Sequence, residues 1–242
     1  TVKVFLGFLE LALAFKFLSN ADLVLQLHWL EREVFLAIWI AVFGTLALYL
    51  FGKIKLPHDG NEHHISVGRL SLGLLVLAFT IYLIPGIWGA PLKMISGFPP
   101  PMNYSEAPYG VGFTKLGTIN GTDGNDSMPA GAELGPHDIL AFNNYNEGLA
   151  YAKKVNKPVL IDFTGYACVN CRKMEERVWA NPHILAILNK EIILVSLYVD
   201  DKRLLPESEQ YTSKTTGKRI KSIGNKWSDF QIKEYQANAQ PY

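Results

Sequence analysis

The stretch KPVLIDFTGYACVNCR, Lys157–Arg172, decides how this chain folds. Its short apolar run, residues 159–163, ends at Thr164-Gly165. The motif Cys168-Val169-Asn170-Cys171 follows, and a helical pattern then runs from Arg172 to Trp179. The chain of 242 residues has only these 2 cysteines. A strand, a turn, a Cys-x-x-Cys motif and a helix in this order are typical of a thiol–disulfide redox site.

The spacing of the two cysteines predicts their roles. At a helix N-terminus, unpaired backbone N–H groups and the helix dipole favour a negative charge, which lowers the pKa of a thiol. The thiolate is the nucleophile, so we expect Cys168 to attack a disulfide. Cys171 lies about one helical turn further on, close enough to resolve the mixed disulfide.

A zinc ligand pair or a plain buried pair is the alternative interpretation of these cysteines. Tetrahedral zinc needs four ligands, and the nearest histidines, His137 and His183, do not stand in a ligand-like repeat. The motif also directly follows a strand that carries Asp162. We therefore predict a redox disulfide, with no metal and no cofactor.

Asp162 is the third candidate catalytic residue. It precedes Cys168 by six residues and stands between apolar Ile161 and Phe163. A carboxylate held there can accept or return the proton of the resolving thiol, Cys171. The alternative is an aspartate at the strand end that faces water.

The segment 157–176, KPVLIDFTGYACVNCRKMEE, resembles the C-terminal thioredoxin-like domain of the DsbD family of bacterial transmembrane thiol–disulfide interchange proteins, also grouped with cytochrome c biogenesis proteins. The resemblance extends through LYVDD (197–201), IGNKWSDFQ (223–231) and NAQPY (238–242). Upstream, GFLELALAFKFLSNADL and LIPGIWGAPLKMISGFPPP are similar to the last membrane helices of that family. The resemblance therefore covers nearly the whole chain.

The resemblance implies a protein-disulfide reductase. Its oxidised Cys168–Cys171 pair would be reduced again by membrane-embedded cysteines that draw electrons from cytoplasmic thioredoxin. Its substrates would be periplasmic disulfide proteins, including the apocytochrome c route. Pro241 matches the cis-proline that faces the motif in this fold, and with Gln240 and Tyr166 it is expected to contact the substrate.

Composition favours a membrane protein with a soluble part. Apolar residues make up 49% of the chain and charged residues only 19%, with a mean hydropathy of +0.10. The formal net charge of +1 gives no reason to expect a nucleic acid as partner.

Three apolar stretches predict a multi-pass helical membrane segment, at residues 2–19, 34–52 and 70–92. The second and third are uncharged and long enough to cross a hydrocarbon core of ~30 Å. We expect Pro85 and Gly86 to kink or end the third helix. Buried core helices of a soluble protein are the alternative. Glu10 is interpreted either as a proton-handling group or as a protonated or hydrogen-bonded packing residue.

Flanking charge predicts the orientation in a bacterial inner membrane. Lys53, Lys55 and Arg69 surround the second loop, whereas Arg32 is the one Lys or Arg of the first. The positive-inside rule then places the second loop in the cytoplasm and the cysteine domain in the periplasm. His58, His63 and His64 in that loop allow a metal interpretation, but a solvated loop is favoured.

Residues 96–137 are rich in Pro, Gly, Asn and Ser and predict a periplasmic linker, and residues 138–242 predict an α/β thioredoxin-like domain. The pattern predicts a helix capped by Asn143 or Asn144 and running to Val155, the strand to Phe163, the redox helix, a helix from Asn181-Pro182 to Lys190, and a buried strand Ile192–Val199. We interpret this succession as part of the β-α-β-α-β order of a thioredoxin-like fold. The polar stretch 201–240 resembles the family's insertion, and we expect its Trp227 and Phe230 to cover part of the domain.

The fold would need two more strands and a helix beyond Tyr242, and the family's membrane cysteines are absent. We interpret the chain as the C-terminal portion of a longer protein, with a thioredoxin-like domain that is incomplete at its C-terminus. Two other hypotheses remain open: a membrane-anchored assembly or scaffold factor for cytochrome c maturation with a structural disulfide, and a dithiol metal carrier.

Overall fold

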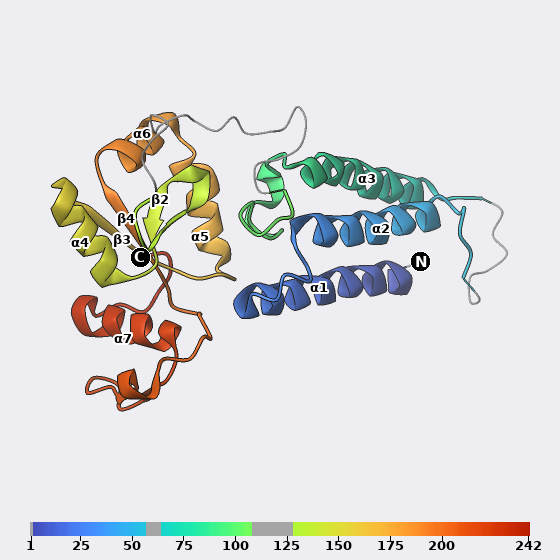
Figure 1. Ribbon diagram of the computed structural model, residues 1–242. Coiled ribbons are helices and arrows are strands. Elements are labelled where there is room, and N and C mark those ends of the chain that lie inside the picture. The colour runs from blue at the N-terminus through green and yellow to red at the C-terminus, as the bar shows by residue number, and fades with distance from the viewer. Residues whose placement is uncertain (1, 57–63, 108–127) are drawn as a thin grey trace. The chain divides into compact units, whose positions relative to one another are not determined.

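The computed structural model describes residues 2–56, 64–107 and 128–242. The chain forms two compact units, one made mainly of residues 1–22 and 27–116 and the other mainly of residues 117–242. The first is helical and the second is an α/β unit (Figure 1). His58 and His63, and the central part of the predicted linker, lie outside the described residues.

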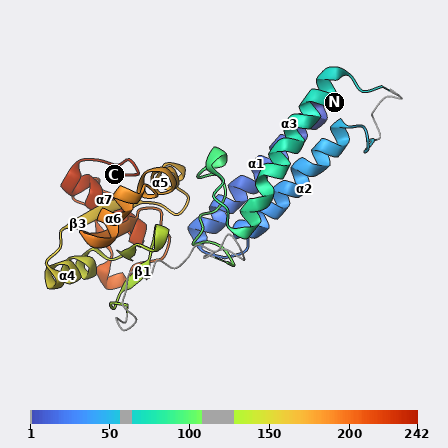
Figure 2. The same ribbon diagram turned by 90° about the horizontal axis from the view of Figure 1, so that it is seen from above.

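Among its described residues, the first unit contains the α-helices α1 (Val2–Leu25), α2 (Arg32–Leu50) and α3 (Val67–Leu83), which run side by side in Figures 1 and 2. Trp39 lies at their core, where it contacts the rings of Phe35 and Phe43. Its indole Nε1 donates a hydrogen bond to the carbonyl oxygen of Ala12 at 3.1 Å, which joins α2 to α1.

Proline ends α3 where the sequence predicted a kink or an end. The helix stops at Leu83, and the 3-10 turn η1 (Ile84–Trp88) follows, with Pro85 in its first turn. Two helical stretches are long and apolar enough to cross a membrane, Arg32–Leu50 and Val67–Trp88. The predicted first span, residues 2–19, lies within α1, which is not one of these two, so a multi-pass segment stays a prediction.

The first part of the predicted linker belongs to the helical unit, which corrects the expectation of a tether over residues 96–137. The hydroxyl of Tyr104 donates a hydrogen bond to Asp22 Oδ2 at 2.8 Å, and Tyr104 is only 3% exposed. The Arg32 guanidinium donates to the carbonyl oxygen of Pro100 at 2.7 Å. These bonds hold a segment that composition alone marks as loop, because they satisfy buried polar groups of α1 and α2.

The α/β unit contains a four-stranded sheet of order β1-β2-β4-β3. Its strands are β1 (Ala132–Leu134), β2 (Leu140–Phe142), β3 (Val159–Thr164) and β4 (Ile193–Tyr198). β4 runs parallel to both β2 and β3, and β1 pairs antiparallel with β2. β1 lies inside the predicted linker, so the sheet begins before the predicted boundary at residue 138.

Helices cover both faces of this sheet (Figure 1). They are α4 (Tyr145–Val155), α5 (Val169–Met174), the π-helical turn η5 (Glu175–Trp179), α6 (Pro182–Lys190) and α7 (Ile223–Tyr235). Asn144, one of the two predicted candidates, caps α4, and Asn181 caps α6, which begins where Asn181-Pro182 predicted a helix. Two short strands, β5 (Tyr211–Thr212) and β6 (Arg219–Ile220), form a separate ribbon.

The two faces of the sheet differ in chemistry, and this difference positions the site. Phe163, Val195 and Leu197 share a core with Trp227 of α7 and Ala152 of α4. Because side chains alternate along a strand, the neighbours of Phe163 point to the opposite face. That face therefore carries polar residues at the carboxyl ends of β3 and β4: Asp162, Thr164, Ser196 and Tyr198.

The segment 201–240 covers the sheet through α7, as expected from its aromatic residues. The ring of Phe230 lies 6.0 Å from that of Phe163 and 5.0 Å from that of Tyr145, measured between centroids. The close contact depends on Gly224, because a Cβ atom there would come within 2.5 Å of the carbonyl oxygen of Val199. α7 is therefore an integral part of the domain core.

Candidate active site

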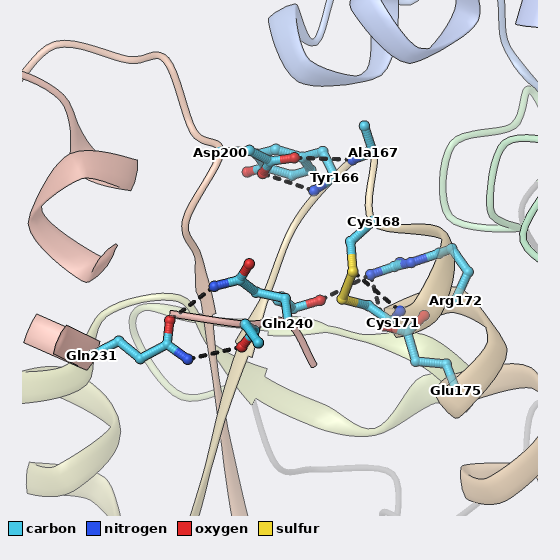
Figure 3. Close-up of a disulfide and its surroundings, with 11 residues drawn as sticks. Tyr166, Ala167, Cys168, Cys171, Arg172, Glu175, Asp200, Gln231 and Gln240 are labelled. Atoms are coloured by element: carbon cyan, nitrogen blue, oxygen red, sulfur yellow. Dashed lines mark hydrogen bonds and ion pairs between the residues drawn. A yellow bond between two sulfur atoms is a disulfide. The ribbon is translucent and has the colours of Figure 1, made fainter. Parts of the chain in front are cut away.

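Cys168 and Cys171 form a disulfide at the start of α5, with their Cα atoms 5.3 Å apart (Figure 3). Cys168 is the N-cap residue, and its Sγ accepts a hydrogen bond from the backbone N–H of Cys171 at 3.2 Å. The helix continues through η5 to Trp179, so the helical segment begins at Val169 and not at Arg172 as predicted. The backbone thus presents an N–H group to the sulfur that we expect to be the nucleophile.

The two sulfur-bearing residues differ in exposure. Cys171 is only 2% exposed, whereas Cys168 is half-buried. A partner disulfide can therefore approach Cys168 but not Cys171. This asymmetry agrees with attack by the first cysteine and resolution by the second.

A carboxylate that the sequence analysis missed holds the turn before Cys168. Asp200, just beyond β4, accepts hydrogen bonds from the backbone N–H groups of Tyr166 and Ala167 at 2.9 and 3.1 Å (Figure 3). The turn fits closely, because a Cβ at Gly165 would meet Asp200 Oδ2 at 2.9 Å. The sequence signal was the position of Asp200 at the carboxyl end of a strand parallel to β3.

Tyr166, an expected substrate contact, lies half-buried against the sheet end. Its ring stacks on that of Tyr198, with centroids 4.1 Å apart and planes inclined by 16°. The stacking and the bond to Asp200 fix this residue two positions before Cys168.

Asp162 is buried and does not face water. It is 7% exposed, and this burial raises the pKa of its carboxyl group to about 6, although the nearby Arg172 guanidinium lowers that pKa. A carboxyl group with this pKa changes its protonation near neutral pH, as proton exchange with a thiol requires.

Two further charged residues next to the disulfide were not predicted. Arg172 follows Cys171 directly, and its Nη2 donates to Glu175 Oε1 at 2.7 Å and to Thr164 Oγ1 at 3.2 Å (Figure 3). Both charged residues are buried. Burial raises the pKa of Glu175 to about 7, against the lowering effect of Arg172. No sequence pattern marked them, because a basic and an acidic residue at this spacing are usual on an exposed helix face.

Gln240 and Pro241 lie at the end of the described chain, and the Gln240–Pro241 peptide bond is cis, as the resemblance implied. Gln231 of α7 is fully buried and holds this segment (Figure 3). It donates to the carbonyl oxygen of Ala239 at 3.0 Å and accepts from Gln240 Nε2 at 2.8 Å. The next residue, Tyr242, accepts a backbone hydrogen bond from Phe163 at 3.0 Å, so the segment lies along the outer edge of β3.

A metal site finds no support in the described parts of the chain. Within them, no group of three or more His, Cys, Asp or Glu side chains is arranged to hold a metal ion. His137 was considered above as a zinc ligand. Its Nε2 atom instead lies 2.8 Å from the backbone carbonyl oxygen of Glu175.

Comparison with known families matches residues 138–217 to a family described as thioredoxin-like. The match includes β2, β3, β4 and the Cys168–Cys171 motif. A search of curated proteins gave no match. The C-terminal α/β domain is thus thioredoxin-like and carries a Cys-x-x-Cys pair in the disulfide form, consistent with thiol–disulfide redox chemistry.

Proposed function

We propose that this chain acts as a membrane-bound protein-disulfide reductase of the DsbD type. One observation carries the proposal: Cys168 is half-buried at the N-cap of a helix, and Cys171 is buried one turn later. A thiol–disulfide exchange enzyme needs this pairing of an accessible nucleophile with a protected resolving thiol.

The reaction starts from the reduced pair. The Cys168 thiolate attacks one sulfur of a substrate disulfide, a new S–S bond forms, and the first substrate sulfur leaves as a thiolate. Asp162 then takes the proton of Cys171, whose thiolate attacks Cys168 Sγ and releases the second substrate sulfur. The substrate gains two electrons, the chain is left with the Cys168–Cys171 disulfide, and both released thiolates take up protons from Asp162 and water.

The source of electrons is a dithiol. We propose that membrane-embedded cysteines, themselves reduced by cytoplasmic thioredoxin, supply it, with periplasmic disulfide proteins as substrates. Two candidate spans support membrane attachment. The helical unit also has a basic end with exposed Lys53 and Lys55, and an opposite end with exposed Trp29 and Trp88. Aromatic residues favour a membrane interface and basic residues favour the cytoplasm, so the charge pattern supports a periplasmic redox domain.

Trapping tests the assignment of the two cysteines. The Cys171→Ser variant should accumulate mixed disulfides with substrate proteins, because Cys168 attacks and nothing resolves the product. The matched Cys168→Ser variant should accumulate none. Mixed disulfides are detected as slower-migrating bands on non-reducing gels, and these bands disappear on reduction. Equal trapping by the two variants would show that the roles are wrongly assigned.

A structural disulfide in a membrane-anchored assembly factor is the second candidate function. The burial of Cys171 favours it, because a static disulfide is also protected from solvent. Equilibration of the full chain with dithiol buffers separates the two. A reducing, thioredoxin-like potential of about −270 mV supports the reductase, whereas failure to exchange with the dithiol supports the structural disulfide.

A further inference from the structure

The residue that follows the redox pair in the chain carries a buried guanidinium. Arg172 is 4% exposed, and its Nη2 bonds Glu175 on the same helix and Thr164 at the end of β3. Figure 3 shows its side chain extending along the Cys168–Cys171 pair toward the strand. An arginine in this position on a helix would ordinarily extend its guanidinium into water, because burial of an unneutralised cation costs free energy.

Arg172 forms an ion pair with the buried carboxyl group of Glu175, and its charge also lowers the pKa of the buried carboxyl group of Asp162. One guanidinium can neutralise one carboxylate, so the three groups together balance their charge only when the two carboxyl groups share one proton. Asp162 and Thr164 are two residues apart on β3 and so point to the same face of the sheet. Asp162 therefore lies on the face of β3 to which Arg172 is bonded through Thr164.

The other groups around this cluster do not supply a second positive charge in the described part of the chain. On β4, Tyr198 is buried, which raises the pKa of its hydroxyl and keeps it neutral. Glu176, beside Glu175, adds negative charge and raises the pKa of Glu175 further. His137 approaches the backbone carbonyl oxygen of Glu175 through its ring. The charge on Arg172 is thus what allows either carboxyl group to ionise.

Packing alone does not explain this arginine well. Its Nε is buried and finds no hydrogen-bond partner among the described residues. A buried donor without a partner lowers stability by roughly 1–3 kcal/mol. A residue selected only to join α5 to β3 would not need that charge and that unsatisfied donor.

We propose that Arg172 is a positioning residue that sets the pH range over which Asp162 can take the proton of Cys171. The proposal rests on the proposed function, since it concerns the resolving step of that reaction. With Arg172 present, Asp162 is ionised at neutral pH and accepts the proton. Without the guanidinium, the two buried carboxyl groups would stay protonated at neutral pH, and Cys171 would lose its base.

The test is a single turnover of the reduced full chain in mild detergent with an aromatic chromogenic disulfide, 5,5′-dithiobis(2-nitrobenzoate). Attack by Cys168 releases one coloured thiolate in a phase that depends on reagent concentration. Resolution by Cys171 releases the second in a phase that does not. The rate of this second phase, followed from pH 5 to pH 9, reports the protonation of the resolving step.

The Arg172→Met variant should move the pH midpoint of the second phase upward by about one to three units, the range by which a neighbouring arginine lowers the pKa of an aspartate. Arg172→Lys keeps the charge and should move it much less. Lys173→Met, which removes an exposed neighbouring charge, is the matched control and should leave it unchanged.

The possible results distinguish the role proposed for Arg172 from the proposed function of the whole site. A second phase that slows equally at every pH in Arg172→Met, with the same midpoint, would show that Arg172 only holds α5 to β3. If Arg172→Met does not fold, the double variant Arg172→Met/Glu175→Gln removes the unpaired carboxylate and must still show the upward shift. A wild-type chain that never releases the second thiolate would instead refute the proposed function.

Discussion

Replacing Asp162 by asparagine should stabilise the oxidised domain at neutral and alkaline pH. The side chain is 7% exposed, and burial raises the pKa of its carboxyl group from 3.8 to about 6, with Arg172 opposing that rise. Between these two pH values the folded domain holds a proton that the unfolded chain has released. Stability due to this group is therefore present below about pH 4 and is lost as the pH rises through 6.

The size of the effect follows from the shift in pKa. A difference of about two pH units corresponds to about 3 kcal/mol between the protonated and ionised forms. Asparagine has the shape of the protonated acid and carries no charge. We therefore expect Asp162→Asn to raise the free energy of unfolding by up to about 3 kcal/mol at pH 8 and to change it little at pH 4.

Urea unfolding of the oxidised protein in mild detergent measures this difference, with far-UV circular dichroism recorded at pH 4, 6 and 8. Glu207→Gln removes an exposed carboxylate and is the matched control, which should leave the curves nearly unchanged. The same Asp162→Asn substitution should slow the release of substrate by Cys171, because the base is lost. If the difference in unfolding free energy between Asp162→Asn and wild type is the same at pH 4 and at pH 8, ionisation of a buried Asp162 does not lower the stability of the domain and the reasoning is refuted.

Two further substitutions test how the site is supported. Asp200→Ala removes both hydrogen bonds to the turn before Cys168, and we expect unfolding to become easier by about 2 kcal/mol in the same urea assay, since bonds to a charged acceptor are strong. Unchanged stability would mean that the turn holds its shape without Asp200. Gly224→Ala places a Cβ against the backbone of Val199 and Asp201, at 2.5 and 2.6 Å, so a loss of roughly 3 kcal/mol is expected. A loss well under 1 kcal/mol would show that α7 can move away from the sheet end.

Local patterns predicted much of this fold. The capping of α4 by Asn144, the start of α6 at Asn181-Pro182, the strand before the motif and the end of α3 just before Pro85 were all predicted from adjacent residues. Caps and prolines act within one turn of the chain, so the sequence around them contains the whole interaction. The predicted linker shows the opposite case, because Tyr104 is held by Asp22, which lies far away in sequence.

The candidate site divides in the same way. Cys168, Cys171 and Asp162 come from one continuous stretch, and the burial of Asp162 agrees with its apolar neighbours. Asp200 and Gln231 were missed because each acts through backbone groups that only the fold brings near. Their residue types alone carry no mark of that role.

By itself, the sequence determined that this chain contains a strand, a Cys-x-x-Cys motif and a helix in the order of a thioredoxin-like redox site, because these features follow from local spacing. Only the tertiary structure decided which charges surround the disulfide. Arg172 and Glu175 have the spacing of an ordinary surface ion pair, but the fold buries both and bonds Arg172 to Thr164, on the same face of β3 as the buried Asp162. Burial removes the water that would otherwise screen these charges, so they act on one another and on the site.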